Sequence, residues 1–375
     1  MPAKLDPAKE HELAELSKEF MESFISRARQ AMLLSSRELG NNKPFQFIAS
    51  SNLKFNASIE WDGSGPLYYI LNWGACLGLC DAAMTISAHS DFCEAYGKEM
   101  GRFGKIEDIE IVRQRFCDYR SPENREDMCS ALPLPTYNLS QPREHLGDVL
   151  FDLTTAIVSL HEQGHALCGH LHFAAKVAKS GFEWYELESN ETSKRQIDQA
   201  TAYAFELQAD AFAFEYLLIV SKNEIIKQFF PDSPLFADGN DGRIDWIFFV
   251  TMAGAIVFSI LEKSEQGMDQ LDRRHPPAKT RMLAFMATLK KALQAFLPDE
   301  TQRNQFLVIV YNNLFVVFEV IDVSPIEREA FNEYFSKTLD DLTHPSCLML
   351  KDAIECLNRL EPELKPLLEL AHQQF

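Results

Sequence analysis

Two histidines four residues apart, with a glutamate between them, are the residues of this chain best suited to chemistry. They lie in the segment His161-Glu-Gln-Gly-His165, an HExxH pattern. Side chains at positions i and i+4 of a helix project the same way, with Cβ atoms about 5–6 Å apart, so two imidazoles can bind one metal ion. Glu162 is rotated by about 100° from His161, so we expect it to stand beside the metal as the general base for the attacking water.

The helical pattern around this segment supports the interpretation, and we predict a helix over residues 143–179. Both histidines lie on its apolar face, which is formed by Leu146, Val149, Leu150, Leu153, Ile157, Leu160, Gly164, Cys168 and Leu171. Two imidazoles on an apolar face would each carry a desolvation cost that a metal removes. The alternative is a pair of ordinary core histidines, hydrogen-bonded to backbone or carboxylate groups.

A catalytic zinc site needs a third protein ligand and keeps its fourth position open. His172 would lie about 10 Å further along the helix, and we expect His170 to point away from the apolar face. The predicted helix over residues 193–222 carries Glu206 and Asp210 four residues apart, on a face otherwise formed by Ala202, Ala209, Ala213 and Leu217.

The alanines allow that second helix to approach closely. We therefore predict that Glu206 is the third zinc ligand and that Asp210 accepts a hydrogen bond from the free ring nitrogen of a ligating histidine. The alternative is that both acids are solvated and that this helix faces the other way.

A third segment, His275-Pro-Pro-Ala-Lys-Thr-Arg281, leads into a further predicted helix. The prolines hold His275 in an extended turn, and Arg281 follows near the helix start. Alone, this is an ordinary entry from a loop into a helix. Together with the other segments, it offers His275 as a catalytic hydrogen-bond donor to an oxyanion and Arg281 as a group that holds Glu206 or Asp210 in place.

The three segments, in this order, resemble the gluzincin metallopeptidases of the M48-like group. The matching motifs are HExxH, ExxAD (Glu206 to Asp210) and HPPxxxR (His275 to Arg281), and the stretch from His165 to His170 followed by leucine resembles an HExxHxxxxHL run. The resemblance covers about residues 145–285. It implies a zincin-like metallopeptidase core with one Zn²⁺ per chain, although the pattern alone leaves cobalt or manganese open.

The N-terminal part resembles a second family. Pro44-Phe-Gln-Phe and Tyr69-Ile-Leu-Asn-Trp precede a helical region and then HExxH, which is similar to the Lit-like phage-exclusion proteases of peptidase family U49. This resemblance implies one folded cellular protein as the substrate, and cleavage that serves defence or growth arrest.

The predicted function is a zinc-dependent metalloendopeptidase of gluzincin type that hydrolyses a protein or peptide substrate. An alternative from another class is a catalytically inactive, zinc-stabilised protein-binding module, in which Cys168 or another histidine fills the fourth metal position.

Charge and cysteine content limit the partners and the location. The chain has 36 Lys and Arg against 55 Asp and Glu, a formal net charge of −19, which repels nucleic acid and anionic membranes. Eight cysteines without a CxxC pair, and an N-terminus without a signal-peptide pattern, indicate a cytoplasmic protein with reduced thiols. We expect no nucleic-acid partner and make no prediction of the oligomeric state.

One apolar run raises the question of a membrane. Residues 246–261 are mostly apolar but fall short of the roughly 20 residues that cross a bilayer, so we predict a buried helix. The alternative is an integral membrane peptidase with spans at residues 246–261 and 306–321.

We predict a mainly α fold with a small β-sheet (α+β), built of a zincin-like core and added helices. Strands are expected within residues 45–71 and a long loop over 118–142. Helices are expected over 8–33, 74–116, 143–179, 193–222 and 243–265, with three or four more over 277–375, broken near Asp299, Ser324 to Pro325 and Thr343 to Pro345. The predicted domains are 1–140 (helical with a short β element), 141–290 (peptidase core) and 291–375 (helical).

Overall fold

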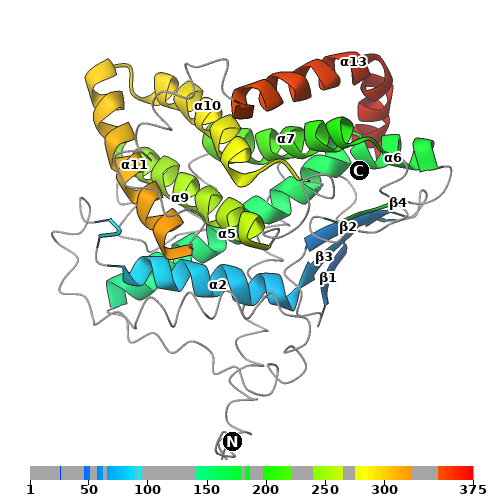
Figure 1. The fold of residues 1–375 in the computed structure, drawn as a ribbon. Coiled ribbons are helices and arrows are strands. Elements are labelled where there is room, and N and C mark those ends of the chain that lie inside the picture. Colours follow the sequence, from blue (N-terminus) through cyan, green and yellow to red (C-terminus); the bar gives the residue numbers. More distant parts are fainter. Residues whose placement is uncertain are drawn as a thin grey trace, which may run out of the picture.

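The protein is mainly α-helical with one small sheet, as predicted from its sequence (Figure 1). The computed structural model describes residue 26 and residues 46–50, 57–61, 66–89, 91–93, 141–178, 182–185, 197–220, 240–264, 275–321 and 345–374. The predicted helix over 8–33 apart from residue 26, residues 94–116 of the helix predicted over 74–116, most of the loop over 118–142, and the break near Ser324 lie outside these residues. The helix predicted over 74–116 is too long, because it ends at Ala88 and residues 91–93 form a turn. The division into three domains stays a prediction.

The sheet contains four strands in the order β1-β3-β2-β4. They are Gln46–Ser50 (β1), Ala57–Trp61 (β2), Tyr68–Asn72 (β3) and Phe182–Tyr185 (β4), all rich in aromatic or β-branched residues that suit a pleated surface. β1 runs parallel to β3, whereas β2 pairs antiparallel with both β3 and β4. The first three strands lie where strands were predicted, but β4 comes from a distant segment that the sequence analysis left unassigned.

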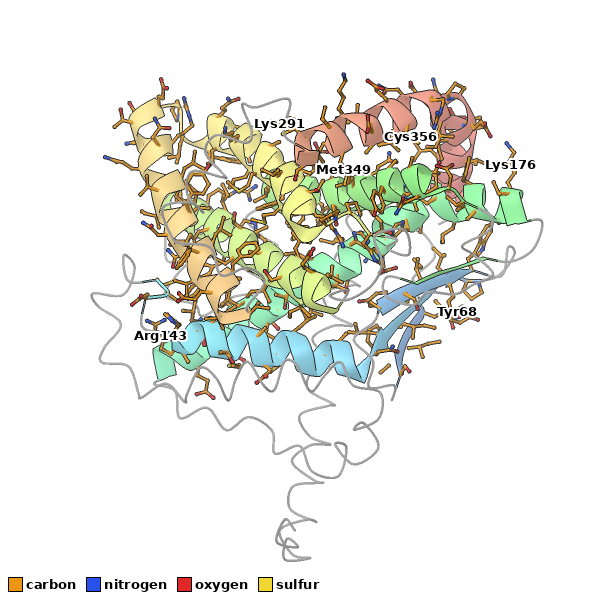
Figure 2. All side chains as sticks on the ribbon, viewed as in Figure 1. Tyr68, Arg143, Lys176, Lys291, Met349 and Cys356 are labelled. Carbon is orange, nitrogen blue, oxygen red and sulfur yellow. The ribbon has the colours of Figure 1, made fainter. Side chains whose placement is uncertain are left out.

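The long helix Gln141–Leu167 (α5) carries the HExxH segment and is covered by other helices. It packs against Trp73–Ala88 (α2), Gln199–Glu215 (α7) and Asn240–Ser264 (α9). Figure 1 shows α2 below α5 and α7 above it, and Figure 2 shows the side chains that fill the space between these helices. Because α5 is enclosed in this way, polar groups in its C-terminal half must find partners inside the protein.

The apolar run over residues 246–261 forms the central part of α9, a buried core helix. Two described helices are long and apolar enough to cross a membrane, Arg243–Glu262 and Glu300–Ile321, and their most apolar windows are 89% and 56% buried inside the protein. Trp246 Nε1 and Arg243 Nη2 of α9 donate to the carbonyls of Leu217 and Leu218. These two carbonyls belong to a π-helical turn, Tyr216–Val220 (η3), and the bonds fix α9 to the end of α7.

The remaining helices cover the outside of this core. Ala278–Phe296 (α10) packs on α7 and α9, Glu300–Ile321 (α11) packs on α9, and Pro345–Gln374 (α13) packs on α7 and on His170–Ala178 (α6). The break before α11 falls at the predicted position, because the Asp299 side chain accepts a hydrogen bond from the backbone amide of Gln302 and caps the helix. α13 begins at Pro345, at the predicted break.

The single helix predicted over residues 143–179 is wrong at one point, because α5 and α6 are separate helices. They are divided at Gly169, which has φ +81°, a left-handed conformation that ends helices and favours glycine. A Cβ atom on Gly169 would lie 3.1 Å from the backbone nitrogen of Leu368, so the packing of α13 also requires glycine here. The break brings His170 back towards α5.

Candidate metal centre

His161, His165 and Glu206 come together where α5 packs against α7. The Nε2 atoms of the two histidines are 3.1 Å apart, His161 Nε2 lies 3.3 Å from Glu206 Oε2, and His165 Nε2 lies 3.4 Å from Glu206 Oε1. All three side chains are buried. They form the one group found among the described residues in which three His, Cys, Asp or Glu side chains could hold a metal ion.

The spacing of these atoms fits a tetrahedral zinc ion. With bonds of about 2.0–2.2 Å, two ligand atoms of a tetrahedral site lie roughly 3.3–3.6 Å apart, close to the observed separations of 3.1–3.4 Å. Imidazole nitrogen and carboxylate oxygen are also ligands that zinc accepts. The residues present therefore fit the ion.

Gly164 allows the two helices to come this close. A Cβ atom at this position would lie 3.0 Å from Ala209 Cα and 3.2 Å from the Ala209 carbonyl oxygen, both backbone atoms of α7. Glycine inside the HExxH segment thus sets the distance between the helix of the two histidines and the helix of Glu206.

We expect Gly164→Ala to move α7 away from α5 and to weaken metal binding. Crowding of this kind costs about 1–3 kcal/mol, more than the roughly 1 kcal/mol that alanine gains over glycine in a helix. Urea unfolding and a zinc titration measure both effects. Gly147→Ala is the matched control on α5, because its nearest contact is the flexible end of Met84. Equal zinc affinity in the two variants would contradict this account of Gly164.

Asp210 joins His161 to Arg281. Its Oδ1 lies 2.9 Å from His161 Nδ1, and Arg281 donates to Oδ2 from Nε at 2.8 Å and to Oδ1 from Nη2 at 2.7 Å. The guanidinium carbon also lies 4.7 Å from the ring centroid of Phe258. Of the two partners proposed for Arg281 from the sequence, Glu206 and Asp210, the structure places it on Asp210.

Charges in the cluster suit the binding of a cation. Burial opposes ionisation of Glu206 and Asp210, but the surrounding histidines outweigh it for Glu206 and Arg281 outweighs it for Asp210, so both carboxyl pKa values lie below the ordinary range. Burial also opposes protonation of His161, yet Asp210 and Glu206 raise its pKa well above the usual value. Burial lowers the pKa of His165 well below its usual value, which leaves this ring neutral and able to bind a metal.

The structure places His275, one of the two predicted catalytic residues, at the same cluster. His275 Nε2 lies 3.7 Å from Glu206 Oε2, and its side chain is buried. Glu162 follows His161 on α5 and is also completely buried. All seven residues proposed for the site from the sequence, on α5, on α7 and in or just before α10, are buried.

Sequence reasoning missed two residues of this cluster, His170 and Gln208. His170 Nδ1 lies 3.0 Å from His165 Nδ1, so the expectation that His170 points away is wrong. Gln208 Oε1 lies 3.0 Å from His170 Nε2, and burial lowers the pKa of His170 to about 4. Gly169 is the residue from which the position of His170 could have been predicted. A glycine in the left-handed conformation ends a helix and lets the following residue turn back towards it.

A family model described as peptidase U49 matches residues 95–295, more than half of the chain. The chain belongs to the peptidase U49 family. This confirms the predicted U49 resemblance, and the matched range includes every residue of the cluster; the M48-like resemblance stays a prediction. No curated protein matches the chain, and no solved structure matches it. As a U49 family member it is a peptidase and acts on a protein or peptide substrate.

Proposed function

We propose that this U49 peptidase is a zinc-dependent endopeptidase with His161, His165 and Glu206 as metal ligands. The observation that carries the proposal is the buried group of three ligand atoms 3.1–3.4 Å apart, contributed by two helices in van der Waals contact. Arg281 and Asp210 support it, because they fix the ring of His161 from outside the group.

The other residues of the cluster have separate roles in this mechanism. Zinc in such a site lowers the pKa of water towards neutrality and polarises a carbonyl oxygen. The Glu162 carboxylate takes the proton of the attacking water and later returns it to the leaving amine. His275 Nε2 donates a hydrogen bond to the oxyanion of the scissile carbonyl. Asp210 accepts the His161 Nδ1 proton, which leaves the Nε2 lone pair available for binding.

We expect the purified protein to contain about one zinc ion per chain and to lose peptidase activity and stability when a chelator removes it. A ligand present at 100 times its dissociation constant stabilises a folded protein by about 2.7 kcal/mol, so zinc should raise Tm. Elemental analysis and thermal unfolding with and without chelator measure this. Purified wild type that binds no transition metal would contradict the proposal.

His165→Ala is the variant that isolates the ligand role in the same experiment. It removes one of two imidazoles and should abolish stoichiometric zinc and the zinc-dependent rise in Tm. The matched control is His145→Ala on α5, more than four helical turns before the HExxH segment, which we expect to keep one zinc per chain. If elemental analysis finds cobalt or manganese in place of zinc, the proposed metal changes but the three proposed ligands stay the same.

We also propose a cytoplasmic location and one folded cellular protein as substrate, cleaved in phage defence or growth arrest. Family U49 membership supports the substrate class, and the six cysteines that the structure describes are free thiols, which suits a reducing compartment. Cell fractionation tests the location. New protein termini that appear in cells with wild type, but not with an inactive variant, would identify the substrate.

A further inference from the structure

His170 connects the ligand His165 to Gln208 of α7. Its two ring nitrogens lie 3.0 Å from His165 Nδ1 and 3.0 Å from Gln208 Oε1. The ring is completely buried and stacks on Phe205, with centroids 4.1 Å apart and planes 6° apart. Phe205 and Gln208 both belong to α7, the helix that supplies Glu206. This helix therefore fixes both the plane of the His170 ring and the direction of its Nε2 atom.

The hydrogen atoms along this connection can be assigned from donor and acceptor capacity. His165 Nε2 faces His161 and Glu206, so it must keep a lone pair to bind a metal, and the ring proton must be on Nδ1. His170 Nδ1 then has to accept that proton with its own lone pair. The His170 proton is consequently on Nε2, where it meets Gln208 Oε1, an atom that can only accept.

We infer that His170 is a positioning residue for the metal centre, which orients His165 and holds it in the tautomer with Nδ1 protonated. This inference rests on the proposed zinc site. The two histidine ligands are thus fixed by different acceptors: His161 by the carboxylate of Asp210, and His165 by the neutral His170–Gln208 pair. A neutral acceptor for the second ligand avoids adding a further charge to the buried cluster.

The backbone break at Gly169 is what makes the arrangement possible. In a continuous helix, a residue five positions after His165 would point to a different side. The left-handed conformation of Gly169 ends α5 and places His170 at the first position of α6, within hydrogen-bond distance of His165. The spacing of five residues, taken as part of one continuous helix, therefore does not predict that the two rings are in contact.

Zinc affinity and tautomer state together test the inference. His170→Phe keeps an aromatic ring to stack on Phe205 but removes both nitrogens, and we expect it to weaken zinc binding by about 10–100-fold, as is typical when a partner of a metal ligand is lost. Gln208→Met should weaken zinc binding in the same direction, and Gln208→Glu, which keeps an acceptor for the His170 proton, should bind zinc more tightly than Gln208→Met. The affinities come from competition with a zinc chelator.

Long-range ¹H–¹⁵N spectra of the zinc-loaded wild type, labelled at histidine, show which ring nitrogen of each histidine carries the proton. A purely structural role of His170 would not fix these positions. We expect His165 to carry its proton on Nδ1 and His170 on Nε2, with the His170 signals assigned by their loss in His170→Phe. If His170→Phe does not fold, the Gln208 variants and the wild-type spectra still test the inference.

His172→Phe is the matched control, because it makes the same substitution in another buried histidine of α6. His172 packs on Trp61, with ring centroids 4.4 Å apart, and we expect wild-type zinc affinity in this variant. If wild type binds zinc and His170→Phe binds it equally tightly, the positioning role alone is overturned. A His165 proton on Nε2 in the zinc-loaded wild type would overturn the positioning role and also the assignment of Nε2 as the ligand atom. Absence of zinc binding in wild type would instead refute the metal site itself.

Discussion

The substitution Glu162→Gln is expected to lower kcat by about 10²–10⁴-fold, the usual contribution of a general base, while one zinc ion per chain is retained. Glutamine has nearly the same shape as glutamate but cannot take a proton from water. Because Glu162 is buried next to His161 in the sequence of α5 and is not one of the three proposed ligands, the loss should appear in turnover and not in zinc affinity or folding. Peptide hydrolysis, elemental analysis and thermal unfolding on one preparation separate these effects.

Glu144→Gln is the control for this experiment. It makes the same substitution on the same helix at an exposed position in the first turn, and activity should stay within about twofold of wild type, as for most surface changes. Undiminished turnover in Glu162→Gln would remove Glu162 from the mechanism. Loss of both zinc and activity would mean that Glu162 supports the metal centre instead of transferring protons.

The sequence predicted the parts of the site that depend on helix periodicity. His161 and His165 are four residues apart on α5, and Glu206 and Asp210 are four residues apart on α7. Such pairs share a helix face whatever the rest of the fold does. The alanines of the second helix, Ala209 among them, allowed the close approach to be predicted, whereas the contact of Gly164 with Ala209 was not.

The features that the sequence did not reveal depend on contacts between distant segments. β4 is only four residues long, and its assignment requires its antiparallel pairing with β2. The position of His170 depends on the left-handed conformation of Gly169 and on α13, whose backbone packs against it near Leu368. A periodic apolar pattern continues through such a break, so periodicity alone extends the helix too far.

Arg281→Met is expected to destabilise the protein by about 3–5 kcal/mol, the cost of removing one partner of a buried ion pair. Arg281 makes two hydrogen bonds to Asp210, and both side chains are buried. Without the guanidinium, burial raises the pKa of Asp210 and leaves its charge poorly compensated. Because Asp210 also contacts the proposed ligand His161, zinc affinity should fall together with the free energy of unfolding.

Lys291→Met is the matched control for this prediction, since Lys291 also joins α10 to α7 through an ion pair. Lys291, labelled in Figure 2, lies 3.5 Å from Glu215, but these side chains are 70% and 50% exposed, so the change should cost no more than about 1 kcal/mol. In the double variant Arg281→Met/Asp210→Asn, removal of the buried charge should make the total cost smaller than the sum of the two single changes. Additive costs in urea unfolding would show that Arg281 stabilises α10 through packing on Phe258 and not through the charge of Asp210.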